Sequence, residues 1–150
     1  MALIVHKYGG TSMGSTERIR NVARRVAKWA RAGHQMVVVP SAMSGETNRL
    51  LALSKDLAPA QPGAAFYREQ DMLAATGEQA SSALLAIALQ AEGMESVSYA
   101  GWQVPIRTDS SYTKARIESI DDKRVRADLD AGKVVIITGF QGIDDEGHIT

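Results

Sequence analysis

Cysteine is absent from this chain of 150 residues, which excludes a disulfide framework, a thiolate zinc site and a cysteine nucleophile. The absence is typical of proteins from the reducing cytoplasm. No apolar run approaches the roughly 20 residues that a membrane span needs, and the N-terminus lacks the features of a signal peptide. Net charge is also lacking, because 17 basic residues balance 17 acidic ones. We therefore expect a soluble cytoplasmic protein whose main partner is neither nucleic acid nor a membrane.

Two widespread nucleotide-binding motifs are missing as well. The chain contains neither Gly-x-x-x-x-Gly-Lys-Ser/Thr nor Gly-x-Gly-x-x-Gly, which argues against the P-loop and Rossmann designs. A different glycine turn, Lys7-Tyr8-Gly9-Gly10, follows the first apolar segment. Glycines allow the backbone to approach a phosphate, and the lysine adds a cation. A surface lysine before a flexible turn would give the same short pattern, so the turn alone decides nothing.

Strands and helices alternate along the chain, which predicts an α/β fold of one domain. The order strand, turn, helix and strand in the first 40 residues predicts a parallel βαβ unit, whose first strand we expect to be buried on both faces. The predicted strands are 2–8, 36–39, 96–100, 103–108 and 134–138. The first predicted helix starts after an N-cap at Ser15 or Thr16 and is closed by Gly33. The other predicted helices are 46–57, 66–75, 78–92 and 121–131, with a break at Thr76-Gly77 between 66–75 and 78–92.

The last residues predict a hairpin whose turn is 144–147, and its acidic side chains are interpreted as solvated. The three histidines show no ligand spacing and are interpreted as incidental. The chain ends while the returning strand is still forming, and an unpaired strand edge is an aggregation risk. We therefore expect these 150 residues to be the front part of a longer protein.

Polar residues follow the second predicted strand in the segment 41–48. Since the carboxyl ends of parallel strands meet at one edge of a sheet, Ser41 and Thr47 would bring hydroxyl groups to the same edge as Lys7. A solvent-facing helix cap is the simpler alternative for this segment. Glu78 would place a carboxylate that fits a substrate ammonium group, but its spacing equally suits a helix N-terminus.

Taken together, these segments resemble the aspartate kinases of the amino-acid kinase superfamily. The similarity covers essentially the whole chain, and several motifs in the right order are more specific than any one of them. It implies a three-layer αβα fold with a mainly parallel sheet. Residues 1–150 would be the N-terminal, substrate-binding part of the kinase domain. The matching segments are 5–12, 17–23, 37–39, 41–43, 45–50, 76–78, 115–117 and 139–142.

The resemblance implies transfer of the γ-phosphoryl group of ATP to the β-carboxylate of L-aspartate. This reaction gives 4-phospho-L-aspartate, the first intermediate of lysine, threonine and methionine biosynthesis. The acceptor carboxylate is already ionised at neutral pH, so a general base is not needed. ATP phosphoryl transfer normally uses Mg²⁺, for which no ligand can be assigned here. The full-length protein is expected to be a homo-oligomer.

The resemblance also implies a role for each motif residue. Lys7 would stabilise the transferring phosphoryl group, and Tyr8, Gly9 and Gly10 would contact the phosphates of ATP. Ser41 would lie near both the phosphate and the aspartate. Thr47 and Glu78 match the family's substrate-binding residues, with Glu78 holding the amino group of aspartate.

The chain also departs from the family pattern. Pro40 stands before Ser41 where family members more often carry another residue, and its missing N–H group could disturb the strand end. The Gly-Arg-Gly-Gly-Ser-Asp motif, the adenine-binding half and the regulatory ACT domains of the family are not among these residues. We therefore expect the isolated chain to be inactive. The alternatives are an acetylglutamate or glutamate kinase, or a non-catalytic binding or assembly module of the same fold.

Overall fold

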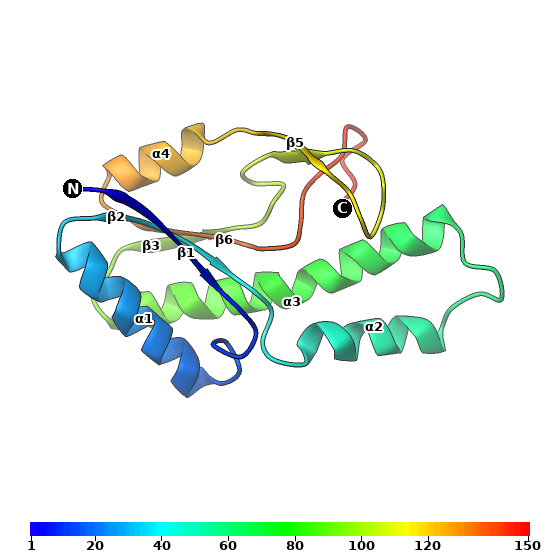
Figure 1. Ribbon diagram of the computed structural model, residues 1–150, viewed down its shortest axis with the longest axis horizontal. Helices are drawn as coiled ribbons and strands as arrows, with labels where there is room; N and C mark the ends of the chain where they lie inside the picture. Colours follow the sequence, from blue (N-terminus) through cyan, green and yellow to red (C-terminus); the bar gives the residue numbers. More distant parts are fainter.

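A four-stranded parallel sheet in the order β1-β2-β6-β3 forms the centre of the protein (Figure 1). The computed structural model describes all residues from 1 to 150. Neighbouring β1 and β2 are parallel, as the βαβ pattern predicts, and they pair from Leu3 opposite Gln35 to Tyr8 opposite Pro40. The strands are β1 (Leu3–Tyr8), β2 (Gln35–Pro40), β3 (Ser96–Tyr99) and β6 (Val134–Ile137).

Helices cover both faces of this sheet, which confirms the predicted three-layer αβα architecture. Alternate residues of β2 and β6 point to opposite faces. Met36 and Val38 pack with α1 (Thr16–Arg31) and α3 (Ala64–Ala91), whereas Val37 packs with α4 (Lys123–Asp130). In Figure 1, α1 and α3 lie below the strands and α4 lies above them.

The first βα unit follows its sequence signals closely. Ser15 caps α1 by accepting a hydrogen bond at its Oγ from the backbone N–H of Arg18, and Gly33 (φ +89°) follows the end of the helix. Pro40 does not disturb the end of β2, because the backbone N–H of Ser41 donates to the carbonyl oxygen of Tyr8 at 2.8 Å. The pairing of β1 and β2 therefore continues up to the start of the next loop.

The predicted break at Thr76-Gly77 is wrong, because α3 runs without interruption from Ala64 to Ala91. Gly77 serves close packing instead. A Cβ atom at this position would lie 3.0 Å from the Cβ of Ala42. The glycine thus lets the loop after β2 approach the helix. α2 (Glu46–Asp56) continues from that loop and packs beside α3.

α3 is also long and apolar enough to cross a membrane, and no other helix is. Eight of its residues are buried against the rest of the protein, among them Leu85 and Leu89 at 0% exposure. Both leucines belong to the core between α1, α3 and the sheet. This part of the helix is therefore buried inside the protein.

The expectation that β1 is buried on both faces is also wrong. Its residues alternate between half-buried and exposed, with Leu3 49% and Val5 60% exposed. The physical reason is that β1 is an edge strand of the sheet, and the buried residues of α4 pack on Val37 and Val135 of the more central β2 and β6. Ile4 and Tyr8, on the other face, pack against the main core.

A second, smaller layer lies beyond the carboxyl ends of the strands. It consists of the antiparallel pair β4 (Ile106–Thr108) and β5 (Ile117–Ile120). β4 lies inside the predicted strand 103–108, but β5 was not predicted. The predicted hairpin at the end of the chain is present in a short form, with Ile143 bridged antiparallel to Ile149.

Candidate active site

The turn after β1 lies directly against the loop after β2. The backbone N–H groups of Ser12 and Met13 donate to the carbonyl oxygens of Gly9 and Gly10, both at 3.1 Å, so the turn is tightly wound. A Cβ atom on Gly10 would lie 3.3 Å from the carbonyl oxygen of Ala42. The structure therefore brings the two predicted loops together, and Gly10 is the residue that allows their close approach.

The loop after β2 presents the predicted hydroxyl groups. Its shape is fixed by the Oγ of Ser81, which donates to the carbonyl oxygen of Ser41 at 2.7 Å. Gly45 then adopts a left-handed φ of +80° just before α2, a conformation that favours glycine. Thr47 lies in the first turn of α2 and is half-buried. Both Ser41 and Thr47 line the same cavity.

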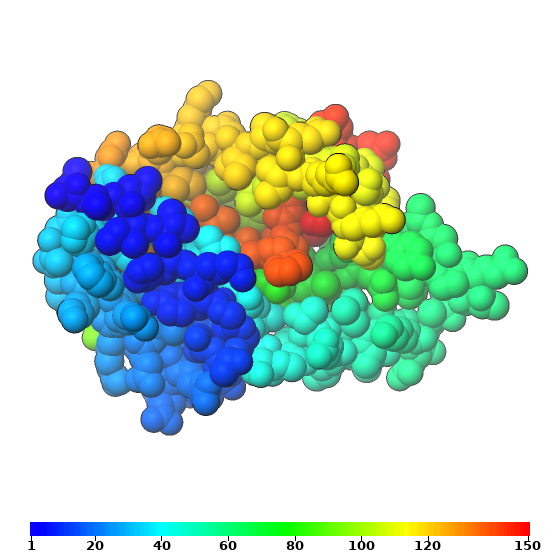
Figure 2. All heavy atoms as spheres, viewed as in Figure 1, coloured from blue at the N-terminus to red at the C-terminus, as the bar shows by residue number.

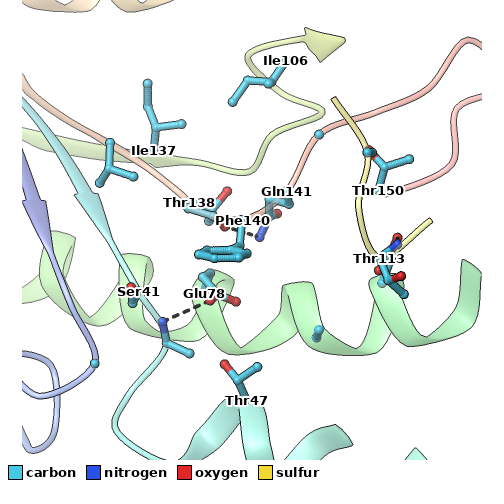
Figure 3. A pocket seen from close by; sticks show the side chains of 18 of the residues that line it. Ser41, Thr47, Glu78, Ile106, Thr113, Ile137, Thr138, Phe140, Gln141 and Thr150 are labelled. Carbon is cyan, nitrogen blue, oxygen red and sulfur yellow. Dashed lines mark hydrogen bonds between the residues drawn. The ribbon is translucent and has the colours of Figure 1, made fainter. Parts of the chain in front are cut away.

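Glu78 supplies a buried carboxylate to this cavity. Its side chain projects from α3 with 5% exposure, and its Oε1 accepts a hydrogen bond from the backbone N–H of Ala42 at 3.3 Å (Figure 3). Burial raises the pKa of Glu78, and the hydrogen bond from Ala42 partly opposes the rise. A bound cation would offset the same desolvation cost, so the residue is well placed to accept a substrate ammonium group.

The glycine turn 139–142, which follows β6, also lines the cavity. Gln141 is buried, and its Nε2 donates to the backbone carbonyl of Ala75 in α3 at 3.1 Å. Phe140 has a left-handed φ of 57° and is 87% exposed, with its ring above Glu78 in Figure 3. The side-chain oxygen of Thr138 is buried without a hydrogen-bond partner. The turn is thus fastened to α3 while its aromatic ring stays free.

These elements enclose a cavity of about 960 Å³. In Figure 2 the hollow lies among residues near 45 (cyan), 115 (yellow) and 138 (orange). Among the predicted site residues, Gly10, Ser41, Thr47 and Glu78 line it. The volume is near the upper end of the range for small-molecule sites, so it leaves room for more than one small substrate.

Lys7, Tyr8 and Gly9 are not among the lining residues. Lys7 shares its strand face with Val5 and pairs with Val39, and both of these valines do line the cavity. The exposed lysine therefore lies on the cavity side of β1. Tyr8 points to the opposite face, where its hydroxyl lies 3.2 Å from Nδ1 of His6 and burial raises its pKa. Only its backbone remains available to a phosphate on the cavity side.

One wall of the cavity was not predicted from the sequence. It is formed by the segment 109–116 between β4 and β5, here called the strap, from which Thr113, Lys114 and Ala115 line the cavity. The backbone N–H of Thr113 donates to Oδ2 of Asp71 in α3 at 2.7 Å. This contact joins residues that lie 42 positions apart. No local pattern in the sequence could have indicated it.

Asp144 contradicts the interpretation of residues 144–147 as a fully solvated turn. It is only 2% exposed and accepts hydrogen bonds from Ser110, Tyr112 and the backbone N–H of His148. Burial raises the pKa of Asp144, but the hydrogen bonds from His148 and Ser110 outweigh this and give a net lowering. His148, interpreted as incidental, lies 2.9 Å from the Tyr112 hydroxyl at its Nδ1. Asp145 and Glu146 are exposed, as expected.

Comparison with known proteins gives a consistent result. The model of the amino acid kinase family matches residues 2–150. An aspartate kinase from Pseudomonas fluorescens is 56% identical over the whole chain, which spans 36% of that enzyme's length. The crystal structure of an aspartate kinase from Synechocystis matches with a TM-score of 0.74 at 39% identity, covering 97% of this chain and 22% of that one.

The fold also matches that of E. coli aspartokinase III in complex with aspartate and ADP. Here the TM-score is 0.84 at 20% identity, over all of this chain and 43% of that one. At this identity the likeness concerns the fold alone. The agreement of sequence model, relatives and architecture leads to one assignment: the chain belongs to the amino acid kinase family.

Proposed function

We propose that residues 1–150 are the N-terminal, substrate-binding part of an aspartate kinase. The full-length enzyme would transfer the γ-phosphoryl group of ATP to the β-carboxylate of L-aspartate and produce 4-phospho-L-aspartate. The observation that carries the proposal is the buried carboxylate of Glu78, which converges with the loops after β1 and β2 on one cavity. The 56% identity to an enzyme named aspartate kinase supports the choice of acceptor.

The reaction requires two anions to be held close together. An oxygen of the aspartate β-carboxylate attacks the γ-phosphorus, and the bond from that phosphorus to the oxygen that bridges it to the β-phosphate breaks. ADP then leaves with the electron pair. No proton has to be removed from the carboxylate at neutral pH. The protein must therefore supply position and charge compensation, which are the main contributions to phosphoryl transfer.

The placement of the residues supports the role proposed for each. Glu78 would bind the ammonium group of aspartate, with Ser41 and Thr47 donating hydroxyl hydrogen bonds to substrate oxygens. Lys7, on the cavity side of β1, would neutralise charge on the transferring phosphoryl group. The backbone of the turn at Gly9 and Gly10 would approach the phosphates. The adenine site would belong to the rest of the protein, so the isolated chain should release no ADP in a coupled assay.

Mg²⁺ is expected together with ATP. No group of three or more histidine, aspartate or glutamate side chains is close enough to hold a metal ion. Mg²⁺ is commonly bound through substrate phosphates and one or two carboxylates. We therefore assign no step to a metal held by these residues. We also infer a cytoplasmic location and a homo-oligomer for the full-length enzyme, in keeping with a biosynthetic role.

Steady-state kinetics of the full-length protein test the acceptor. Aspartate should be phosphorylated with a far higher kcat/KM than glutamate or acetylglutamate. A preference for either of the latter would replace aspartate kinase by another amino-acid kinase. No turnover with any of the three would favour a non-catalytic module.

The Lys7→Ala variant tests the catalytic role. Loss of charge stabilisation in the transition state should lower kcat by about 10²- to 10³-fold. Lys28→Ala is the matched control, since this lysine is exposed in α1, away from the cavity. An unchanged kcat in Lys7→Ala would remove the role proposed for this lysine.

A further inference from the structure

The peptide group that joins Ser41 to Ala42, here called the 41–42 peptide, is held by two side chains of α3. Its carbonyl oxygen accepts a hydrogen bond from Oγ of Ser81 at 2.7 Å. Its N–H group donates to Oε1 of Glu78 at 3.3 Å (Figure 3). Neither group pairs with another backbone group. The orientation of the 41–42 peptide therefore depends on these two side chains.

Both side chains come from one face of α3, because residues three positions apart on a helix are neighbours. Glu78 is 5% exposed and Ser81 is 0% exposed. Gly77 lies just before them, and a Cβ atom on this glycine would come within 3.0 Å of the Cβ of Ala42. One stretch of α3 thus supplies the space, the acceptor and the donor that the 41–42 peptide needs.

The hydroxyl of Ser81 is required to keep the peptide in this orientation. A peptide group has its donor and its acceptor on opposite sides, so a carbonyl oxygen directed at Ser81 leaves the N–H group directed at Glu78. Without the hydroxyl, the carbonyl oxygen of Ser41 would lose its donor beside a fully buried position. A buried acceptor without a partner is costly, and this cost favours rotation of the peptide away from α3.

The N–H group of Ala42 acts on the carboxylate of Glu78 in two ways. It determines where Oε1 lies, and it favours the ionised form of the carboxyl. Burial raises the pKa of Glu78, and the hydrogen bond from Ala42 lowers it in part. The ionised form is the one that accepts a substrate ammonium group. Ser81 can therefore influence the acceptor site although it does not line the cavity.

We propose that Ser81 is a positioning residue of the acceptor site, which acts through the 41–42 peptide on the carboxylate of Glu78. The inference rests on the proposed function and extends it by a residue outside the cavity. The neighbouring Ser82 shows that burial alone does not give this role. Ser82 is 1% exposed, but its hydroxyl oxygen has no hydrogen-bond partner.

Steady-state kinetics of the full-length enzyme test the role of Ser81. Ser81→Ala should raise the KM for aspartate by about tenfold, the effect of one lost hydrogen bond, and leave the KM for ATP nearly unchanged. Ser82→Ala is the matched control, because it removes the same atom from the same helix at the same burial without breaking a bond. Equal KM values for aspartate in the two variants overturn the proposal.

The pH dependence of kcat/KM for aspartate distinguishes positioning from a loss of packing. Its acid limb reports a group of the free enzyme that must be ionised, which is Glu78 in this proposal. In Ser81→Ala the limb should move to higher pH by about half a pH unit or more, because Ala42 no longer favours the ionised carboxylate. Ser82→Ala should keep the limb of the wild type. An unshifted limb in Ser81→Ala contradicts the connection through the 41–42 peptide.

A crystal structure of the full-length Ser81→Ala variant tests the positioning without any activity. The carbonyl oxygen of Ser41 should have turned away from α3, and the N–H of Ala42 should no longer donate to Glu78. A 41–42 peptide in the wild-type orientation overturns the role of Ser81. Should glutamate or acetylglutamate prove to be the acceptor, aspartate kinase fails as the function, and this structure still decides whether Ser81 positions the peptide.

Discussion

The two walls that face each other across the cavity are built in different ways. The loops after β1 and β2 continue directly from the core, and Met13 and Ala42 within them are 0% and 3% exposed. Their contacts are mainly between backbones and depend on a glycine where the chains approach, at Gly10. The strap has no buried residue and depends on side-chain acceptors, Asp71 and Asp144.

This difference has a consequence for function. A wall that continues from the packed core is held as firmly as the core itself, which suits groups that must meet a transferring phosphoryl group within a fraction of an ångström. A wall held by a few hydrogen bonds opens locally at a low free-energy cost. Such a wall suits the entry and recognition of the acceptor. Substitutions in the two walls should therefore act through different measurable quantities.

The largest effect is expected at the base of the strap. Asp144→Ala removes a buried acceptor from at least three donors, so the free energy of unfolding should fall by about 3 kcal/mol in urea titrations. Asp145→Ala is the matched control. Asp145 is next in sequence and paired with Arg107 at 3.6 Å, but its side chain is 89% exposed, so the loss should be about 0.5 kcal/mol or less.

The pKa of Asp144 gives the same experiment a second readout. Because the folded-state pKa is lowered, the stabilisation by Asp144 is complete above the ordinary carboxyl pKa of about 4 and is lost as the pH falls through the lowered value. Asp144→Ala should therefore show a flatter acid limb than the wild type. If Asp144 and Asp145 variants lose equal stability, the strap does not depend on the buried acceptor as proposed.

A smaller effect is expected where α3 packs against the wall formed by the loops after β1 and β2, here called the first wall. Gly77→Ala places a Cβ atom 3.0 Å from that of Ala42, and such overpacking costs about 1–3 kcal/mol. Alanine regains about 1 kcal/mol of helix propensity, so the net loss should be near 1 kcal/mol. The substitution also pushes on Ala42, whose N–H contacts Glu78, and should raise the KM for aspartate in the full-length enzyme.

Ala80→Gly separates these two contributions. Ala80 is exposed in the same helix, so this variant measures the helix propensity alone. If Gly77→Ala instead stabilises the protein by as much as Ala80→Gly destabilises it, the loop has moved away without cost. The first wall would then be no more rigid than the strap.

The sequence predicted more of the wall formed by the loops after β1 and β2 than of the strap. Short-range signals predicted the glycine turn after β1 and the hydroxyl-bearing loop after β2, and Gly10, Ser41 and Thr47 of these segments line the cavity, whereas Lys7, Tyr8 and Gly9 do not. Glu78, which also lines it, was assigned only through the family resemblance. Strand order and helix spacing suffice there, because parallel strands bring their carboxyl ends to one edge. The error at Gly77 shows the limit, since a glycine that allows close packing and a glycine that ends a helix look alike in sequence.

The strap could not be predicted because its contacts are distant in sequence. Asp71 and Thr113 are 42 positions apart, and Asp144 and Ser110 are 34 apart. Neither aspartate carries a local pattern that distinguishes it from a solvated one. The wrong prediction that β1 is buried on both faces has a related cause. An apolar segment does not reveal whether it forms a central strand or an edge strand.

The smallest effect is expected at the tip of the strap and concerns Asp71. Burial raises the pKa of Asp71, and the hydrogen bond from Thr113 opposes the rise only in part. A carboxyl whose pKa is raised in the folded state costs stability above that pKa, and the cost disappears as the pH falls below the ordinary value. Asp71→Asn removes the charge and keeps an acceptor. It should therefore leave stability at pH 7 unchanged or raise it by at most about 0.5 kcal/mol after screening by solvent.

Urea unfolding of wild type and Asp71→Asn between pH 4 and pH 8 measures this difference. The excess in the free energy of unfolding of Asp71→Asn over the wild type should be greatest at neutral pH and should disappear as the pH falls. The sign is opposite to that expected for Asp144, whose ionised form stabilises the protein. If the wild type is instead the more stable protein at neutral pH and loses this advantage as the pH falls, the ionised carboxylate stabilises the folded protein. The tip would then be held by charge, like the base, and the two tethers of the strap would no longer differ.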